Sequence, residues 1–469
     1  MNTLAGRRFL RSAGTLSALV AACVLVCANA SQAQQRRPGQ AEPPAQPAPA
    51  QPAPTQPANP ATPTPAQPAP APTQVKPAPP KPSFLDNVIK PGRTRNWTLR
   101  VNVHVDAYQT DPRKLGQPGN KELQVKPITF ETAAVVFPIV TQSAGSEAVP
   151  EAMRGTLFFD DRPMDTEPEL SPTIYHSGTR LARWEMTNKS GREMDLRVEI
   201  PMTTWETVFD EKLAERAVWP AGGKWPEVAA STFSGLAFVD YQSPVVTNLI
   251  SQWSGGRDPK TVRPVPLAKY LAGQVLEIMQ PTGTGLETSR NGELEGFKLQ
   301  RASTTLSLGR GSEHDIAIAL CAVYLAAGLP ARTVIGYDVT ATKGEDSGPF
   351  GRTKGSARLR SWVEFALYDE SSDKLIWVPV DIVRQRKSSS KAPPLDRPWK
   401  YFGSNDELDD VMPIAYQHHP PTTVVAHGSR CFWGWLTTPT IPEGASQYIK
   451  FESMTTPNRG RPPQRDSGR

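Results

Sequence analysis

Charged side chains stand at the ends of three predicted elements, and their types limit the chemistry that the chain can do. Glu313 lies at the start of an apolar helix, and Arg360 and Asp381 lie on two strands predicted after it. A carboxylate is a poor nucleophile toward an acyl carbon, and an arginine does not give up its proton near neutral pH. Glu313 and Arg360 are therefore unsuited to act as the nucleophile and the base of an acyl transfer.

The helix that follows Glu313, predicted over residues 315–327, is apolar on every face. Ile316, Leu320 and Val323 keep helical spacing, and Ile318 and Cys321 make the other face apolar too. A helix without a polar face is buried. A carboxylate in the first turn of such a helix can accept backbone donors and complement the helix dipole, so we expect Asp315 to have a structural role.

Three motifs follow one another in this region: GLPAR at 328–332, RSWVE at 360–364 and WVPVD at 377–381. They resemble the "GIPAR" turn, the "HAWVE" strand and the "WxPxD" strand of the transglutaminase-like superfamily, which has a papain-like fold. In that family a CxD element begins the central helix. The resemblance places Glu313 at the nucleophilic cysteine, Arg360 at the catalytic histidine and Asp381 at the aspartate that orients it. This placement implies an ion-pair cluster in which the arginine fork bridges both acids.

By this resemblance the chain is a secreted, bacterial type of transglutaminase-like protein whose triad positions are vestigial. One reading is a catalytically inactive pseudoenzyme that binds a peptide, a glycan or another envelope component. The alternative is a cysteine-independent hydrolase or acyltransferase with a rearranged site, in which His418 or His419 restores a base and Ser312 attacks. A third is a structural or assembly role of the N-terminal β domain.

No cofactor and no metal site are expected. His314 stands between Glu313 and Asp315, but consecutive helical residues point about 100° apart and cannot share one ion. We expect His314 to be a partly solvated residue at the helix start. Cys321 is most simply a small buried thiol. A bridge to Cys431 or a displaced nucleophile are the alternatives.

The first 30 residues have the pattern of a secretory signal. Basic Arg7, Arg8 and Arg11 precede an apolar run, and residues 28–30 read Ala-Asn-Ala, a small-residue cleavage site. This pattern predicts export to the periplasm or the extracellular space. Two alternatives stay open: a lipobox that would lipidate Cys23, the one case in which membrane contact is expected, and a twin-arginine signal at Arg7 and Arg8.

The charge balance gives no support to nucleic-acid binding. The chain has 52 basic and 46 acidic residues, and removal of the three N-terminal arginines leaves 49 against 46, or about +3. Residues 38–82 contain 18 prolines among Ala, Gln and Thr, so they cannot form a core. They make either a semi-stiff spacer or a solvated low-complexity tail.

These patterns predict an α+β fold, with an N-terminal antiparallel β domain before a core in which a buried helix packs on an antiparallel sheet. The expected segments are a signal peptide at 1–30, a disordered linker at 31–83, the β-rich domain at 84–232, the core at 233–395, a C-terminal extension at 396–454 and a disordered tail at 455–469. Strands are predicted at 97–105, 130–140, 155–159, 180–186, 194–200, 333–339, 359–367 and 374–382. Helices are predicted at 245–253 and 267–279, a hairpin connection at 188–191 and an exposed, functionally variable loop at 343–357.

Overall fold

The computed structural model divides into two units, Met1–Lys76 and Pro77–Arg469, and every described residue lies in the second. The described residues are 81–110, 125–170, 176–234, 236–289, 293–342, 359–389, 391–418, 426–427, 434–439, 441 and 447–455. The predicted signal, nearly all of the linker, the loop at 343–357, His419 and Cys431 lie outside them. None of the helices in these described ranges is both long and apolar enough to cross a membrane.

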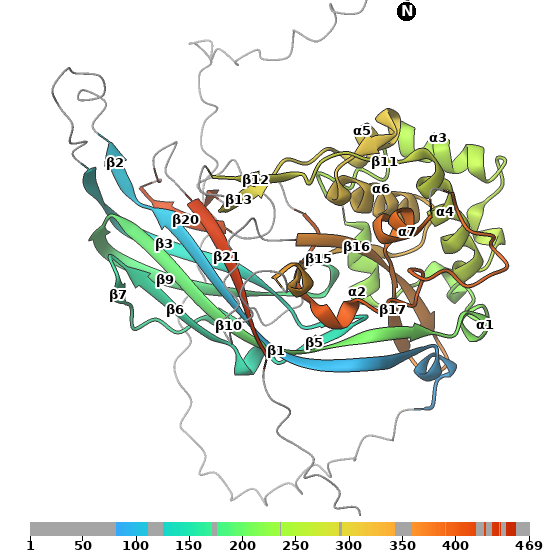
Figure 1. The fold of residues 1–469 in the computed structure, drawn as a ribbon, viewed down its shortest axis with the longest axis horizontal. Coiled ribbons are helices and arrows are strands. Elements are labelled where there is room, and N and C mark those ends of the chain that lie inside the picture. Colours follow the sequence, from blue (N-terminus) through green and yellow to red (C-terminus); the bar gives the residue numbers. More distant parts are fainter. Residues whose placement is uncertain are drawn as a thin grey trace, which may run out of the picture. The chain divides into compact units, whose positions relative to one another are not determined.

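The first layer is a nine-stranded sheet in the order β12-β13-β21-β1-β10-β5-β4, with β6 beside β10 and β7 beside β6 (Figure 1). Its strands are β1 (Ile89–Asp106), β4 (Gln142–Ser143), β5 (Ser146–Ala148), β6 (Arg154–Phe159), β7 (Arg162–Pro163), β10 (Glu193–Phe209), β12 (Leu286–Thr288), β13 (Leu294–Phe297) and β21 (Gln447–Thr455). The apolar residues of β1 alternate with polar ones, and this period of two buries one face of the strand.

A second sheet of six strands has the order β19-β20-β3-β9-β8, with β2 beside β3. Its strands are β2 (Tyr108–Thr110), β3 (Val125–Val140), β8 (Glu169–Leu170), β9 (Thr179–Gly191), β19 (Ala426–His427) and β20 (Gly434–Thr438). One hydrophobic cluster joins both sheets, with Leu99 of β1 and Phe137 and Trp184 of the second sheet fully buried. A Cβ on Gly155 would lie 2.3 Å from the Trp184 ring, so only glycine fits there.

The hairpin connection predicted at residues 188–191 is wrong, because these residues are the last four of β9. β9 pairs with β3 and β8, whereas the next strand, β10, pairs with β1, β5 and β6. The chain therefore crosses from one sheet to the other at Arg192, between the two strands. The turn residues indicate a change of direction, but packing across the two layers decides which strand becomes the partner.

The third sheet has four antiparallel strands in the order β17-β16-β15-β18. They are β15 (Ala331–Asp338), β16 (Leu359–Asp369), β17 (Lys374–Val380) and β18 (Val411–Tyr416). The helices beside it are α1 (Glu211–Ala214), α2 (Glu227–Ala230), α3 (Pro244–Trp253), α4 (Pro264–Ile278), α5 (Ala302–Leu308), α6 (Glu313–Ala326) and α7 (Ile382–Ser388), and β11 (Gln280–Pro281) pairs with β14 (Arg310–Gly311). The α+β prediction is confirmed.

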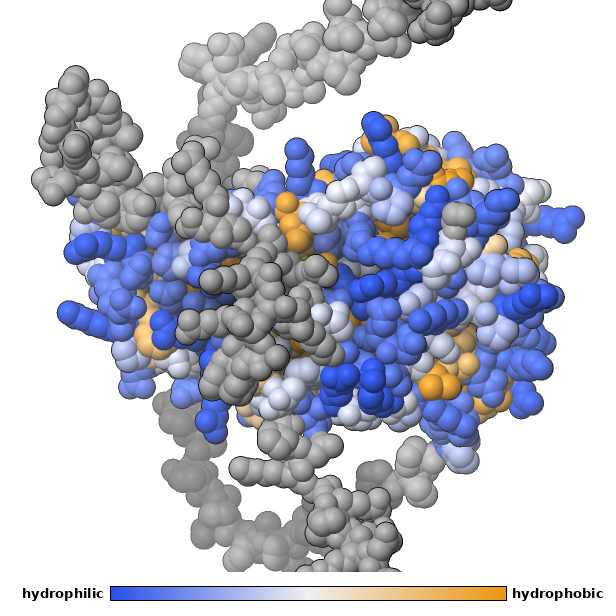
Figure 2. All heavy atoms as spheres, viewed as in Figure 1, coloured by the Kyte–Doolittle hydropathy of each residue, from blue (hydrophilic) through white to orange (hydrophobic). Residues whose placement is uncertain are grey.

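Short 3-10 helices connect these elements. They are η1 (Phe84–Asn87), η2 (Pro150–Ala152), η3 (His176–Gly178), η4 (Ala221–Gly223), η5 (Ser231–Phe233), η6 (Pro259–Thr261), η7 (Val339–Thr342) and η8 (Leu408–Asp410). In the view of Figure 2 the surface is mostly hydrophilic, with apolar residues in small separate patches. Such scattered apolar exposure is ordinary for a folded surface.

Helix α6 is buried on all sides, as its sequence predicted. Leu320 and Cys321 have no exposed surface, and the helix packs against β15, β16, α4 and α5 in one hydrophobic cluster. Its first turn is closed by a capping box. Ser312 accepts the N–H of Asp315 at 3.2 Å, and the Asp315 carboxylate accepts the N–H of Ser312 at 2.8 Å. The Asp315 carboxylate also accepts the N–H of Gln300 at 2.7 Å.

The ribbon of β1 and β10 joins the two-sheet layer to the helical part of the molecule. The strands pair from Asp106 and Glu193 to Ile89 and Phe209, and η1 continues from β1 to the far end of β16 and β17. Residues after 396 contribute to both parts. They supply β18 to the four-stranded sheet and β21 to the nine-stranded sheet, where it pairs with β1.

His104 on β1 lies between two carboxylates. Its Nδ1 is 3.0 Å from Asp195 and its Nε2 is 2.9 Å from Asp106, while Tyr448 stacks on the ring at 4.6 Å. Burial by itself lowers the pKa of His104, but the hydrogen bonds and charges of Asp195 and Asp106 outweigh burial and raise the pKa to about 9. The folded chain therefore holds a proton here that the unfolded chain releases near pH 6.5.

We predict that His104 makes the folded state less stable as the pH rises from neutral to alkaline. The stabilisation is fully present below about pH 6.5 and is lost as the pH passes through about 9, because the raised pKa belongs to the folded state. The free energy of unfolding, measured by urea titration at several pH values, should show a falling difference between the parent and His104→Gln. A difference that does not change with pH would contradict this.

Candidate functional site

Arg360 and Asp381 are brought together by the ends of two neighbouring strands. Arg360 is the second residue of β16, and Asp381 directly follows β17. The Asp381 carboxylate caps helix α7 by accepting the N–H of Arg384 at 2.9 Å, and its other oxygen accepts a hydrogen bond from Arg360 Nη2 at 2.7 Å. The cap fixes the carboxylate, so it can hold the guanidinium in one orientation.

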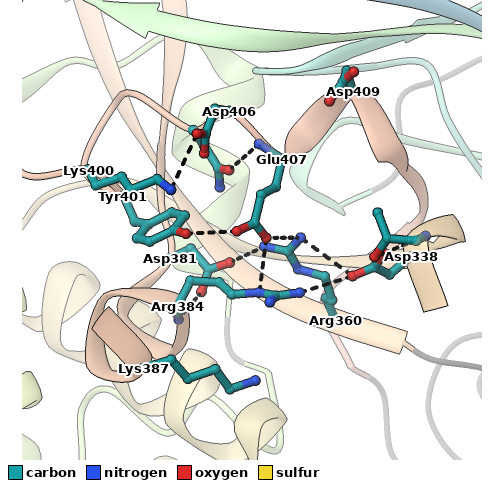
Figure 3. A network of polar contacts seen from close by, with 12 residues as sticks. Asp338, Arg360, Asp381, Arg384, Lys387, Lys400, Tyr401, Asp406, Glu407 and Asp409 are labelled. Atoms are coloured by element: carbon teal, nitrogen blue, oxygen red, sulfur yellow. Dashed lines mark hydrogen bonds and ion pairs between the residues drawn. The ribbon is translucent and has the colours of Figure 1, made fainter. Parts of the chain in front are cut away.

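Two further carboxylates surround Arg360, as Figure 3 shows. Glu407 lies 3.2 Å and Asp338 lies 3.6 Å from its Nη1, and Arg384 contacts the same two acids at 3.3 and 3.1 Å. Burial by itself lowers the pKa of Arg360, but the charges of the surrounding carboxylates outweigh burial and raise the pKa above its usual value. Arg360 is thus a permanent cation in a cluster of three acids and two arginines.

Glu313 does not belong to this cluster. The expected pair of Arg360 with Asp381 is present, whereas the expected pair of Arg360 with Glu313 is not. The Glu313 carboxylate pairs with Lys387 at 2.6 Å, and both side chains are partly exposed. Lys387 lies on α7, which packs beside the start of α6 and supplies a nearby cation. Arg360 is already engaged by Asp338 and Glu407, two residues that the sequence reading did not place in the site.

The segment that carries Tyr401 and Glu407 covers this cluster. Tyr401 donates a hydrogen bond to Glu407 at 2.7 Å, and its own N–H donates to the side chain of Gln385 on α7. Beside α6 and α7 lies a cavity of only about 10 Å³, lined mostly by apolar side chains. A ligand therefore finds little room in this cavity.

A second polar contact joins α6 to β16 at the residue after Arg360. His314 Nδ1 lies 2.6 Å from the Ser361 hydroxyl, and both side chains are buried. His418 and Phe297 pack edge-on against His314, with ring centroids at 5.6 and 4.7 Å. Burial lowers the pKa of His314 to about 3, so the imidazole is neutral. The expectation of a partly solvated His314 is wrong, because these side chains enclose it.

Among the cysteines that the structure describes, Cys321 is a free thiol without exposed surface. Burial is the main cause that raises its pKa to about 12, against weaker opposing effects of hydrogen bonds from Gln417 and Thr333. A thiol is nucleophilic only as the thiolate, so Cys321 is an inert core residue. Ser312 is occupied by the helix cap and donates its hydroxyl to Asp315 at 2.7 Å.

The arginine of the GLPAR turn, Arg332, ties the two parts of the molecule together. Its Nε and Nη2 donate to Glu364 at 3.0 and 2.7 Å, and its remaining donors reach the carbonyl oxygens of Ser177 at 2.7 Å and Gln142 at 3.1 Å. The guanidinium lies between the rings of Trp377 and Tyr416, at 4.0 and 3.8 Å from their centroids.

The sequence contained few local signals for the residues that it missed. Arg384 lies three residues after Asp381, the spacing of a capping aspartate and the third residue of its helix, and Ser361 directly follows Arg360. Asp338 ends a strand recognised from its pattern. Glu407 has no such signal, because it reaches Arg360 only through the folding of a long connection.

We predict unequal effects of removing the two members of the expected triad. Arg360→Ala leaves Asp338, Asp381 and Glu407 short of a cation and should lower the free energy of unfolding by about 3–5 kcal/mol. Glu313→Ala removes a partly exposed pair and should cost less than about 1 kcal/mol. Urea unfolding followed by circular dichroism measures both. Equal losses would show that the cluster does not depend on Arg360.

Comparison with known proteins agrees with the motifs. Residues 274–382 match the family model described as the transglutaminase-like superfamily. Among solved structures the chain is similar to a proposed cysteine protease from Cytophaga hutchinsonii, with 12% identity and a TM-score of 0.44 over 80% of this chain and 95% of that one. It is also similar to a proposed protease from Parabacteroides distasonis, with 11% identity and a TM-score of 0.18 over 61% and 59% of the two chains. A search of curated proteins finds no match. Residues 274–382, with α6, the GLPAR turn and the strands of Arg360 and Asp381, form a domain of the transglutaminase-like superfamily.

Proposed function

We propose that the chain is an exported, catalytically inactive transglutaminase-like protein that binds a peptide, a glycan or another component of the cell envelope. The observation that supports inactivity is the setting of Arg360. This residue stands where the family has its catalytic histidine, and it is held by Asp381, Asp338 and Glu407. A base must release its proton near neutral pH, and the raised pKa of Arg360 prevents this.

The thiol chemistry of the family also lacks a residue to carry it. Glu313 takes the cysteine position and pairs with Lys387, and Cys321 lies two helical turns further along in the core. Because burial raises the pKa of Cys321 to about 12, its thiolate is not populated at neutral pH. The fold is then retained for its surfaces rather than for acyl transfer.

We predict that a soluble iodoacetamide probe does not label Cys321 in the folded Cys431→Ser variant. The reason is full burial together with the raised pKa. Adding Glu313→Cys to this background should restore labelling, because position 313 is partly exposed at a helix start, where thiol pKa values fall. Mass spectrometry measures the labelling of Cys321 and of position 313. As a control, Cys321 should be labelled once the protein is unfolded in urea. Rapid labelling of folded Cys321 would contradict an inert thiol.

Export is supported by the basic residues and the apolar run before Ala28 and Ala30.

We predict that expression in a Gram-negative host yields a periplasmic protein whose first residue is Ser31, determined by mass spectrometry of the intact chain. If the mature chain instead begins at Cys23 and this residue carries acyl chains, the protein is a lipoprotein. An uncleaved chain in the cytoplasm would overturn export itself.

The alternative function, a cysteine-independent hydrolase or acyltransferase, is favoured by one observation, the 2.6 Å contact between Ser361 and His314. A hydroxyl beside a neutral imidazole is the arrangement of an activated serine. Two features make this hydrolase function less well supported than the inactive binding protein. Both side chains are buried, and an imidazole whose pKa is lowered to about 3 is a weak base.

We predict that a fluorophosphonate probe does not label the folded protein, because Ser361 is buried together with His314, which it contacts. The matched control is Ser361→Ala, which should show the same background in gel fluorescence. Labelling of the parent that disappears in Ser361→Ala would make the hydrolase reading the better one.

A further inference from the structure

A cleft of about 720 Å³ lies away from the cluster around Arg360. Its lining includes β17 from Leu375 to Trp377, β4 with its neighbours, and Trp205 of β10. Both β17 and β4 are edge strands of their sheets. The cleft therefore lies where the edges of two different sheets meet.

The backbone of β17 has one edge that is only partly occupied. At its far end the carbonyl oxygen of Pro379 accepts the N–H of Gly403 at 2.7 Å, and the N–H of Asp381 donates to Tyr401 at 3.0 Å. Alternate residues of a strand present their backbone groups to the same edge. Leu375 and Trp377 therefore present their N–H and C=O groups on the edge where Pro379 and Asp381 bind.

The position of Pro379 supports this parity independently. Proline has no N–H and is tolerated in a sheet only where that group would face away from the partner strand. On its inner edge β17 pairs with β16 over its whole length. Among the residues that the structure describes, no strand pairs with Leu375 or Trp377 on the outer edge. Both residues line the cleft.

We infer that this cleft binds an extended peptide, which adds to the edge of β17 as a further strand. The N–H and C=O groups of Leu375 and Trp377 recur every second residue, a spacing of about 6.6 Å that an extended polypeptide backbone repeats. Trp205 and Trp377 line the same space and favour apolar side chains on the peptide.

This inference rests on the proposed binding role, because it names the ligand class and the surface that would serve that role. The peptide-binding inference and the proposed absence of catalysis can each be wrong without the other. A labelled thiol or serine would overturn the absence of catalysis and would leave the edge of β17 unchanged. A failure to bind peptide would remove this site and would leave the arguments from Arg360 and Cys321 unaffected.

The test uses the folded protein and a capped heptapeptide of alternating threonine and valine. Two further peptides carry N-methyl groups on all valines or on all threonines. An added strand donates through alternate N–H groups only, so one methylated peptide should lose affinity by about tenfold or more, and the other should bind within about twofold of the parent peptide. Titration followed by tryptophan fluorescence measures all three.

Hydrogen exchange locates the bound peptide. The N–H groups of Leu375 and Trp377 should exchange at least about tenfold more slowly with the peptide present, because pairing closes them from water. Equal affinity of the two methylated peptides, no binding at millimolar peptide, or protection confined to other strands would each overturn the inference.

A pair of variants tests the same edge from the side of the protein. Leu375→Pro removes the outward N–H and should weaken peptide binding by about tenfold, while Leu375→Ala keeps the N–H and should stay within about threefold. Circular dichroism verifies that each variant is folded. If Leu375→Pro does not fold, the methylated peptides still decide the question. Equal binding by the two folded variants would contradict pairing at residue 375.

Discussion

The buried guanidinium of Arg332 is the interaction on which the arrangement of the chain depends. Its charge is matched by Glu364, whose other oxygen accepts the N–H of Ala144 at 2.9 Å. The same guanidinium reaches the carbonyl oxygens of Gln142 and Ser177, which belong to the β-rich part. A buried ion pair is retained only where its remaining donors and acceptors are satisfied. This polar network acts together with the hydrophobic cluster that packs β15 and β18 of the four-stranded sheet on the β-rich part.

The cluster around Arg360 has a different character. It contains Asp338, Asp381 and Glu407, and Arg384 is its second cation. Desolvation offsets much of the attraction in such a cluster, so its presence is not a source of large stability. Its effect is on chemistry, because every group within it is committed to an ion pair.

The connection between α7 and β18 decides which surfaces are open. Lys269 on α4 is buried, and its ammonium donates to the carbonyl oxygens of Leu395 at 2.9 Å and Arg397 at 2.7 Å, with Glu211 as its counter-ion. This contact holds the connection against the helices, and the segment that follows lies over Arg360. A cleft of about 720 Å³ lies instead beside β17, whose outer edge at Leu375 and Trp377 pairs with no strand of the described residues.

The sequence by itself determined the elements whose signals are local: the burial of α6, which lacks a polar face, the alternating strand β1 and the GLPAR turn. The tertiary structure decided the rest. Glu313 pairs with Lys387 on another helix, and Glu407 reaches Arg360 from 47 residues away in sequence. Periodicity reports which face of an element is buried, whereas the partner of a charge depends on distances that form only when separate segments pack together.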